Sequence, residues 1–367
     1  MGARTRGIAN QILSGGLDAT DGLSGAVSSS NIANASVTSV SSTPSIGGGF
    51  DKVASDPPSP VEGDIWFNTT SNTVKGYVYA AAAWATGGNL NNSKDGFTGA
   101  GTQTAGLAFG GEDTTPAPSK LTETEEYDGT SWAEQNNLST ARKVPGGLGT
   151  QTAALAFGGF NDPGVTILSS SEEYGGTSWT SGGNLGTGRY NITGTGTQTA
   201  GLGIGGSPPA ANGLVNVEEY NGTSWTGGGN LPVANRSSGS AGSQTAGLNF
   251  GGYGPATDVN TTSEYDGSTW TSGGNMNTAR RTHAGDGLQT AAIALGGSTG
   301  SNSALTELYD GSTWTTTSNM NTARRYLAGC GTTTAALGAG GYAPGSKTNA
   351  TEEFSGAAVA TKTLTSS

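Results

Sequence analysis

Short apolar segments alternate with runs of glycine and small polar residues over most of the chain. The clearest segment reads GTQTAGLAFGG at 101–111, where a polar start leads into a few apolar residues and a Gly-Gly pair. Apolar runs this short, bounded by glycine, predict buried β-strands, because helices need longer periodic stretches. Six copies occur, with third residues Gln103, Gln151, Gln198, Gln244, Gln289 and Thr333.

A second segment follows the first five copies and places a tyrosine five residues before a tryptophan. Asp-Gly or Asn-Gly lies between them in most copies, and glycine supplies the positive φ angle of a tight hairpin turn. We therefore expect tyrosine and tryptophan on neighbouring antiparallel strands. The pairs are Tyr127 and Trp132, Tyr174 and Trp179, Tyr220 and Trp225, Tyr265 and Trp270, and Tyr309 and Trp314.

A third segment closes each unit with Asn-Leu or Asn-Met followed by an arginine. Successive units are 48, 47, 46, 45 and 44 residues apart. About four short strands fit into a unit of this length, which is typical of a β-propeller blade that buries its faces by stacking around a ring. The arginines are Arg142, Arg189, Arg236, Arg280 and Arg324.

This order of segments resembles the kelch repeat. The resemblance rests on Gly110-Gly111, Tyr127, Trp132 and Arg142 with their counterparts downstream, and it covers roughly residues 75–367. It implies an all-β fold of the kelch-like β-propeller type but no particular activity. The innermost strands depart from the family pattern, because they carry alanine and glycine rather than bulky aliphatic residues. We expect close approach of the backbones there.

The two ends of the repeat region complement each other. Tyr79 and Trp84 form one further pair before the first copy, whereas the last hairpin begins with Phe354 and has Val359 at the tryptophan position. We expect the strand with Trp84 to complete the last blade, since this removes free sheet edges. The prediction is a six-bladed propeller with an extended N-terminal attachment region and a β-hairpin. The alternative is a seventh, half-built blade.

The N-terminal region has a different amino-acid composition, in which serine, alanine and asparagine dominate. The sequence DPPSP at 56–60 predicts a stiff linker, and the residues that follow read as a hairpin with an Asn/Thr turn. Residues 60–77 resemble a hairpin module of bacteriophage tail fibres. The predicted organisation is an attachment or oligomerisation region with linker (1–62), a fibre-type hairpin leading into the ring-closing strand (63–74), and the kelch-like propeller (75–367).

Composition narrows the classes of function. Glycine and proline account for 65 and 13 of the 367 residues without a collagen period. No apolar run approaches the length of about 18 residues that a membrane-spanning helix needs. The net charge of −11 without a basic cluster argues against nucleic-acid binding. Because Cys330 and His283 are single, we expect no intrachain disulfide, no catalytic triad, no metal and no cofactor.

Two sets of charged residues recur in the units. Paired glutamates can serve acid–base chemistry or bind calcium, but neighbours on a strand point to opposite faces, so a structural role is favoured. The repeated arginines can line an anion-binding channel, but their recurrence in every unit favours a structural hydrogen bond. The glutamate pairs are Glu125-Glu126, Glu172-Glu173, Glu218-Glu219 and Glu352-Glu353.

The loops after the Gly-Gly pairs vary in sequence while the strands repeat. Variable loops on a rigid scaffold often carry recognition, and aromatic residues there can stack on sugars. The alternative is that the sequences of short surface loops vary freely because the loops have no function. The candidate binding residues are Asp113, Phe160, Asp162, Asn212, Tyr253, Asp258 and Tyr342.

These features predict a structural virion protein of a bacteriophage, a tail or fibre appendage, rather than an enzyme. Its N-terminal region would attach to other virion proteins as a homotrimer, and the propeller would bind a host-surface glycan or decorate the particle. Residues 1–7 contain two arginines, but no apolar core of a signal peptide follows them, so we expect assembly in the host cytoplasm, exposure on the virion and no membrane insertion. The alternatives are a cellular carbohydrate-binding adhesin, or an enzyme with convergent carboxylates at the ring centre.

Overall fold

The computed structural model describes residues 51–113, 120–161, 166–208 and 213–364, in which every regular element is a β-strand. The prediction of an all-β fold is confirmed. The chain divides into two compact units. The first, here the repeat domain, is Ala83–Gly356. The second, the end domain, combines Met1–Ala82 with Ala357–Ser367, of which residues 51–82 and 357–364 are described.

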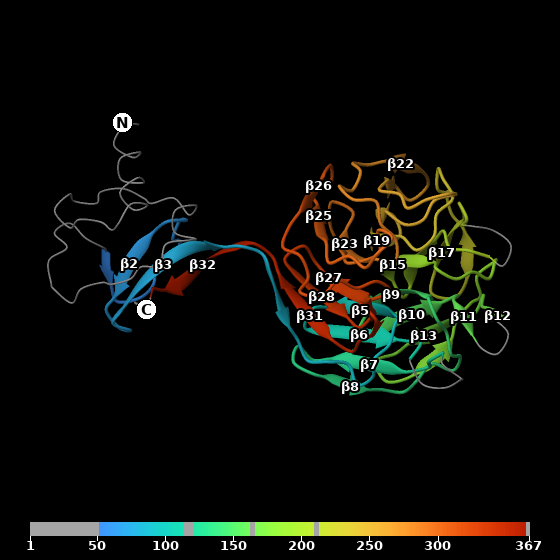
Figure 1. The fold of residues 1–367 in the computed structure, drawn as a ribbon, viewed down its shortest axis with the longest axis horizontal. Coiled ribbons are helices and arrows are strands. Elements are labelled where there is room, and N and C mark those ends of the chain that lie inside the picture. Colours follow the sequence, from blue (N-terminus) through green and yellow to red (C-terminus); the bar gives the residue numbers. More distant parts are fainter. Residues whose placement is uncertain (1–50, 114–119, 162–165, 209–212, 365–367) are drawn as a thin grey trace. The chain divides into compact units, whose positions relative to one another are not determined.

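Within its described residues, the repeat domain contains six four-stranded antiparallel sheets (Figure 1). Sheet 1 consists of β5 (Thr98–Thr102), β6 (Ala105–Phe109), β7 (Thr124–Tyr127) and β8 (Trp132–Glu134). Sheet 2 consists of β9 (Gly146–Thr150), β10 (Ala153–Phe157), β13 (Ser171–Tyr174) and β14 (Trp179–Ser181). Sheet 3 consists of β15 (Thr193–Thr197), β16 (Ala200–Ile204), β17 (Val217–Tyr220) and β18 (Trp225–Gly227).

The other three sheets repeat this order. Sheet 4 consists of β19 (Gly239–Gly242), β20 (Gly247–Phe250), β21 (Thr262–Tyr265) and β22 (Trp270–Ser272). Sheet 5 consists of β23 (Ala284–Leu288), β24 (Ala291–Leu295), β25 (Thr306–Tyr309) and β26 (Trp314–Thr316). Sheet 6 consists of β27 (Ala328–Gly331), β28 (Ala335–Ala339), β31 (Thr351–Ser355) and β4 (Ala83–Thr86). Two short hairpins are β11 (Phe160–Asn161) with β12 (Thr166–Ile167), and β29 (Tyr342–Ala343) with β30 (Ser346–Lys347).

The predicted segments occupy equivalent strands in these sheets. The apolar segment forms the second strand, the tyrosine ends the third, and the tryptophan begins the fourth. Tyr127 lies opposite Trp132, as the hairpin prediction requires. In the turn between them Gly129 has a φ of 92°, and Asp128 Oδ1 accepts a hydrogen bond from the backbone N–H of Thr130 at 2.8 Å. A side chain that caps its own turn explains why Asp or Asn precedes this glycine.

The last sheet takes its fourth strand from the N-terminal side of the repeats. Trp84 in β4 lies opposite Phe354 in β31, so the predicted pairing of the Trp84 strand with the last repeat is confirmed. Val359 belongs instead to β32 (Ala358–Thr363), where it lies opposite Tyr79 in β3 (Thr73–Ala80) of the end domain.

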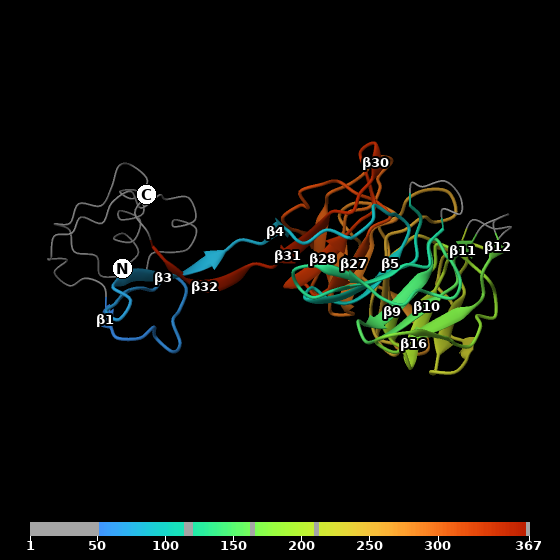
Figure 2. The same cartoon turned by 90° about the horizontal axis from the view of Figure 1, so that it is seen from below.

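The sheets of the repeat domain have a propeller-like arrangement. The first strands contact one another in the order β5, β9, β15, β19, β23, β27 and again β5. These strands lie toward the middle of the domain in Figure 1, whereas fourth strands such as β8 and β22 lie at its periphery. Turned by 90°, the domain shows β30 projecting from one face (Figure 2).

A ring of backbone hydrogen bonds connects equivalent residues just before the first strands. The N–H of each residue donates to the carbonyl of its counterpart in the preceding repeat at 2.6–3.0 Å, and Gly96 N–H donates to Tyr326 O. All of these residues have positive φ angles, between 45° and 63°. The strained left-handed conformation is maintained by the hydrogen bonds that it makes possible. This backbone ring consists of Gly96, Val144, Asn191, Ser237, Thr282 and Tyr326.

Neighbouring sheets pack through aromatic side chains. The rings of Trp179 in sheet 2 and Phe109 in sheet 1 are 4.9 Å apart, and Trp179 Nε1 donates a hydrogen bond to Thr124 Oγ1 at 2.9 Å. The same contact recurs between Phe157 and Trp225 at 4.8 Å. Each tryptophan thus buries apolar area while its N–H is satisfied across the sheet boundary.

The repeated glutamine connects each sheet to the one before it. Gln151 Nε2 donates to the backbone carbonyls of Gly106 at 3.1 Å and Tyr127 at 2.7 Å in sheet 1. Gln103 in sheet 1 makes the corresponding bonds to sheet 6, where it reaches Phe354 O at 2.6 Å. Thr333 stands at this position in the sixth repeat and is too short to reach equivalent carbonyls.

The end domain is one four-stranded sheet in the order β1 (Asp51–Val53), β2 (Ile65–Asn68), β3 and β32. The carboxylate of Asp56 accepts hydrogen bonds from Trp66 Nε1 at 3.1 Å, Asn68 Nδ2 at 2.7 Å and Lys75 Nζ at 2.8 Å. Lys75, then Asn68 and Trp66, lower the pKa of Asp56 to about 2. Asp56 therefore belongs to the packed hairpin, and β3 extends this domain beyond residue 75, the predicted start of the propeller.

Candidate functional site

Four of the repeated arginines, and Lys94 at the equivalent position of the first repeat, form ion pairs inside the sheets. Their cationic side chains are 0 % exposed, and each packs against a glutamate on the third strand of its own sheet. A buried cation needs such a partner, so these groups are structural. The pairs are Lys94–Glu125 (2.5 Å), Arg142–Glu172 (2.7 Å), Arg189–Glu218 (3.1 Å), Arg280–Glu307 and Arg324–Glu352 (2.8 Å).

Sheet 4 replaces this ion pair with neutral groups. Asn235 occupies the cation position and donates a hydrogen bond to Gly251 O at 2.7 Å, while Ser263 stands in place of the glutamate. Placing Arg236 in the repeated arginine series was therefore wrong, because it lies one residue later than the others. The signal was present in the sequence: Leu231 precedes Arg236 by five residues, whereas the spacing is four in the other copies.

The glutamate that directly precedes the tyrosine position, which is the second glutamate wherever a pair occurs, accepts a hydrogen bond from the tyrosine of the next sheet. Tyr174 Oη donates to Glu126 at 2.9 Å, and Tyr309 Oη donates to Glu264 at 2.5 Å. Burial, followed by the bond to Glu264, raises the pKa of Tyr309 to about 12. The two carboxylates of a pair thus serve different partners on opposite faces of the strand, as the structural interpretation predicted.

The residue after each Gly-Gly pair forms an isolated antiparallel β-bridge. Its partner is the residue that directly follows the buried cation of the same repeat, or that follows Asn235 in sheet 4. We call these the loop-face residues: Glu112, Phe160, Ser207, Tyr253, Ser298 and Tyr342. Their bridge partners are Asp95, Lys143, Tyr190, Arg236, Arg281 and Arg325. The same backbone pairing therefore carries a different side-chain pair in each repeat.

Repeats 3 to 6 contribute to a pocket of about 270 Å³ beside the backbone ring. The guanidinium carbons of Arg236 and Arg281 lie 4.9 and 5.0 Å from the centroid of the Tyr253 ring. Arg281 pairs with Asp258 at 2.7 Å and remains 37 % exposed. We call this pocket the basin; its lining residues are Asn191, Arg236, Ser237, Tyr253, Arg281 and Tyr326.

Lysine residues surround the loop-face position of repeat 1. Glu112 accepts hydrogen bonds from Lys120 at 2.7 Å, from Lys347 at 3.1 Å and from Lys143. Burial opposes the charge of Glu112, but the three lysines hold its pKa well below the usual range. Lys347 also donates to Asp113 O at 2.5 Å, which connects repeat 6 to repeat 1.

The described candidate loop residues lie at the basin, at the neighbouring arginine–tyrosine stack outside it, or in the lysine-rich part. Tyr253 and Asp258 bridge each other at the basin, and Tyr342 lies under the guanidinium of Arg325 at 4.7 Å. Asp113 and Phe160 lie in the lysine-rich part, where Lys120 Nζ is 5.5 Å from the Phe160 ring centroid. Asp162 and Asn212 lie outside the described residues.

Sequence reasoning missed Arg281 and Arg325 of the loop face, and it placed Arg236, the third arginine there, in the buried series. They directly follow the cation position, and the doublets Arg280-Arg281 and Arg324-Arg325 were the available signal. In each doublet the first side chain is buried and paired, while the second reaches an aromatic ring on the loop face.

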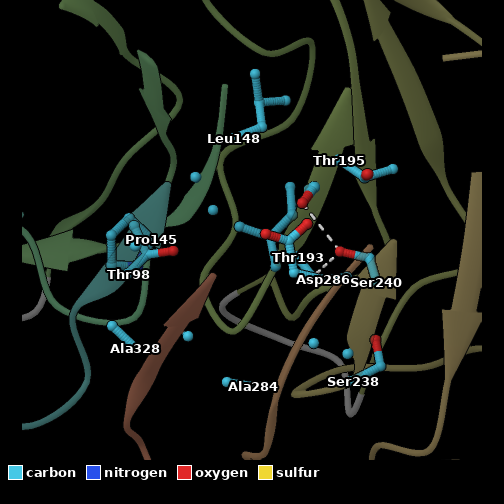
Figure 3. A pocket seen from close by; sticks show the side chains of 18 of the residues that line it. Thr98, Pro145, Leu148, Thr193, Thr195, Ser238, Ser240, Ala284, Asp286 and Ala328 are labelled. Atoms are coloured by element: carbon cyan, nitrogen blue, oxygen red, sulfur yellow. Dashed lines mark hydrogen bonds between the residues drawn. The ribbon is translucent and has the colours of Figure 1, made fainter. Parts of the chain in front are cut away.

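A polar channel of about 160 Å³ runs among the first strands (Figure 3). Thr193 and Ser240 form a hydrogen bond of 2.7 Å within it. Asp286 accepts hydrogen bonds from the backbone N–H groups of Gly287 at 2.7 Å and Gly331 at 2.8 Å, and burial raises its pKa to about 6.

The single histidine and cysteine are also buried near the channel. His283 Nε2 accepts a hydrogen bond from Gly239 N–H at 3.1 Å, and burial followed by nearby Arg280 lowers its pKa to about 3. Burial raises the pKa of Cys330. In the described ranges, no cluster of three or more His, Cys, Asp or Glu side chains is arranged to hold a metal ion. Nor do these ranges include a helix that is long and apolar enough to span a bilayer.

Comparison with known proteins gives no family assignment. A scan against protein-family models finds no match, and a search of curated proteins finds no match either.

Proposed function

We propose that the chain is a structural virion protein of a bacteriophage, a tail or fibre appendage that displays a six-bladed kelch-like β-propeller. The propeller serves host-surface binding or decoration and has no catalytic role. The end domain and the residues before it attach the protein to other virion proteins as a homotrimer.

Three contacts support a closed ring of six blades. The backbone ring returns from Tyr326 to Gly96, and Gln103 in sheet 1 bonds to sheet 6. The strand with Trp84 supplies the fourth strand of sheet 6. A propeller closed in this way gives the last sheet its fourth, outer strand, so that no sheet is left one strand short where the two ends of the ring meet.

The observation that carries the binding role is the basin on the loop face. It combines guanidinium groups, tyrosine rings and small polar side chains in a concave site, and these groups are typical of carbohydrate recognition. Its residues come from the repeat positions that vary most, while the buried ion pairs and the backbone ring provide a rigid support.

The attachment role is supported by the end domain. Residues 60–77, which resemble a tail-fibre hairpin, lie within a sheet that contains strands from both ends of the chain. In a display protein, such a sheet provides the fixed end.

The test is to locate the full chain on purified phage particles by immunogold labelling and cryo-EM, with particles from a deletion mutant as the control. We expect labelling on the tail or its fibres. Absence of the chain from particles would overturn the virion proposal. If the chain were absent from particles but the purified chain bound glycans, the cellular adhesin would become the favoured function.

A further inference from the structure

The two arginines of the basin are held against one aromatic ring. Arg236 and Arg281 lie 4.9 and 5.0 Å from the Tyr253 centroid, and Tyr253 Oη donates to Ala256 O at 3.0 Å, which orients the ring. Two guanidinium groups beside one ring repel each other, and the cation–π contacts with Tyr253 and the carboxylate of Asp258 oppose this repulsion, as a bound anion would. The site is therefore preorganised to accept negative charge.

Only one of these cations has a carboxylate partner in the described residues. Asp258 pairs with Arg281 at 2.7 Å, whereas no carboxylate oxygen of the described residues lies within 4.0 Å of Arg236. The Nε atom of Arg236 is buried and has no hydrogen-bond partner in that part of the chain. In the described residues Arg325 of the loop face also has no carboxylate partner, but Arg325 does not line the basin.

The floor of the basin offers groups that suit a sugar. Asn191, Ser237 and Tyr326 belong to both the basin and the backbone ring, so the ring determines their positions. In the described residues, the side chains of Asn191 and Ser237 make no hydrogen bond, which leaves them available to ligand hydroxyl groups. The Tyr326 ring adds an apolar face for the C–H groups of a pyranose.

We propose that the basin binds an acidic saccharide. Its anionic group accepts hydrogen bonds from the guanidinium groups of Arg236 and Arg281, its ring packs on Tyr326, and its hydroxyl groups bond to Asn191 and Ser237. A planar guanidinium donates two parallel hydrogen bonds to a carboxylate, sulfate or phosphate ester, and this shared chemistry defines the ligand class. The inference rests on the proposed host-binding function and names its substrate class.

The lysine-rich part of the loop face provides the contrast. There Glu112 already neutralises Lys120, Lys143 and Lys347, so added anions compete with an internal carboxylate. In the basin the cations are balanced by a single aspartate. We therefore expect acidic saccharides to bind at the basin in preference to the lysine cluster.

The experiment is calorimetric titration of the full chain with four probes. Oligogalacturonate carries carboxylates, a heparin-derived disaccharide carries sulfates, mannose 6-phosphate carries a phosphate, and cellotriose is neutral. We expect saturable binding of at least one acidic probe and none of cellotriose. Raising the salt concentration should weaken binding, because the contact is ionic. Absence of saturable binding for all three acidic probes would overturn the inference.

Variants locate the site. Arg236→Gln and Arg281→Gln should each weaken binding of the acidic probe by about tenfold or more, since each removes a charge-assisted hydrogen bond. Arg325→Gln, which alters the neighbouring arginine–tyrosine stack outside the basin, should leave affinity within about twofold. Thermal unfolding of each variant establishes that it folds. Unchanged affinity in Arg236→Gln would show that the ligand binds elsewhere.

The outcomes separate this inference from the proposed function. If the chain is found on particles and adheres to host cells while Arg236→Gln adheres equally well, the virion role stands and the basin assignment is wrong. If the chain is absent from particles but acidic saccharides bind through Arg236, the ligand assignment stands and the virion role is wrong.

Discussion

In sheet 5, two consecutive positions carry arginines under opposite conditions. Arg280 is 0 % exposed and paired with Glu307, whereas the next residue, Arg281, is 37 % exposed, stacks on Tyr253 and pairs with Asp258. The interior position holds a cation in every sheet except sheet 4, while the loop-face position varies from Asp95 to Arg325. Residue type alone therefore says little about role; the partner and the exposure distinguish a structural arginine from a binding one.

The largest expected effect comes from breaking an interior pair. Glu307→Gln leaves the Arg280 guanidinium buried without a counter-charge, and it should lower the free energy of unfolding by about 3–5 kcal/mol. Guanidinium chloride unfolding measures this change. An effect below about 1 kcal/mol would contradict the structural role.

Sheet 4 supplies the matched control for that variant. It carries Asn235, Asn249 and Ser263 where sheet 5 has Arg280, Ala294 and Glu307. Transferring this neutral trio into sheet 5 as Arg280→Asn, Ala294→Asn and Glu307→Ser should recover part of the stability lost in Glu307→Gln, since no unpaired charge remains.

Asp286 tests the rule that a buried charge needs a partner of opposite charge, because its carboxylate accepts hydrogen bonds from two backbone N–H groups and forms no ion pair in the described residues. Burial raises its pKa to about 6 in the folded protein, above its unfolded value, so the folded state binds the proton more tightly. Its contribution to stability is present at low pH and is lost as pH rises from about 4 to 6, with a total of up to about 3 kcal/mol.

The comparison of wild type with Asp286→Asn isolates this contribution. His283, with a lowered folded pKa of about 3, has the opposite slope and destabilises the fold as pH falls below about 6.5, but it is present in both proteins. As pH rises from 4 to 7, the wild type should lose up to about 3 kcal/mol of unfolding free energy relative to Asp286→Asn. A pH-independent difference would show that Asp286 keeps its ordinary pKa.

The bonds between sheets should have smaller effects. Tyr174→Phe removes the hydrogen bond to Glu126 and should cost about 1–2 kcal/mol in unfolding experiments. The chain itself carries the apolar alternative, because Phe354 replaces the tyrosine where Leu308 replaces the glutamate. The double variant Tyr174→Phe, Glu126→Leu should therefore lose less than the sum of its single variants. Strict additivity would mean that the two side chains are not coupled.

The smallest effect on stability is expected at the loop face. Asp258→Asn removes the partner of Arg281 and should change the free energy of unfolding by less than about 1 kcal/mol, since the pair is partly exposed. Titration should then show tighter binding of the acidic probe, because the basin has gained net positive charge. Weaker binding would indicate that Asp258 orients Arg281 rather than competing with the ligand.

Much of the repeat domain could be predicted from the sequence, because each segment was periodic. The Tyr–Trp hairpins, the apolar second strands, the pairing of Trp84 and the split roles of Glu125 and Glu126 all follow from local pattern and strand alternation. The small residues of the first strands are consistent with close packing, since a Cβ on Gly147 would lie 2.5 Å from the Thr98 side chain.

The basin could not be predicted in the same way. Its residues come from four repeats, and the contact of Arg281 with Tyr253 depends on how neighbouring sheets are placed rather than on any spacing along the chain. The backbone ring was missed because it requires positive φ at Val144 and Thr282, residue types that disfavour this conformation and give no sequence signal. Asp56 was placed in a linker because prolines follow it directly, whereas its hydrogen-bond donors Trp66 and Lys75 lie 10 and 19 residues further along the chain.

The strand β4 has a consequence for synthesis of the protein. Residues 83–86 leave the ribosome before any repeat, but their partner β31 is made after all the other strands of the repeat domain. β4 stays unpaired while more than 250 residues are added, so sheet 6 is completed only after β31 has been synthesised. A circular permutant of the repeat domain that begins at residue 87 and carries 83–86 after β31 would remove this delay, and the repeat domain should then fold faster with the same contacts between its strands.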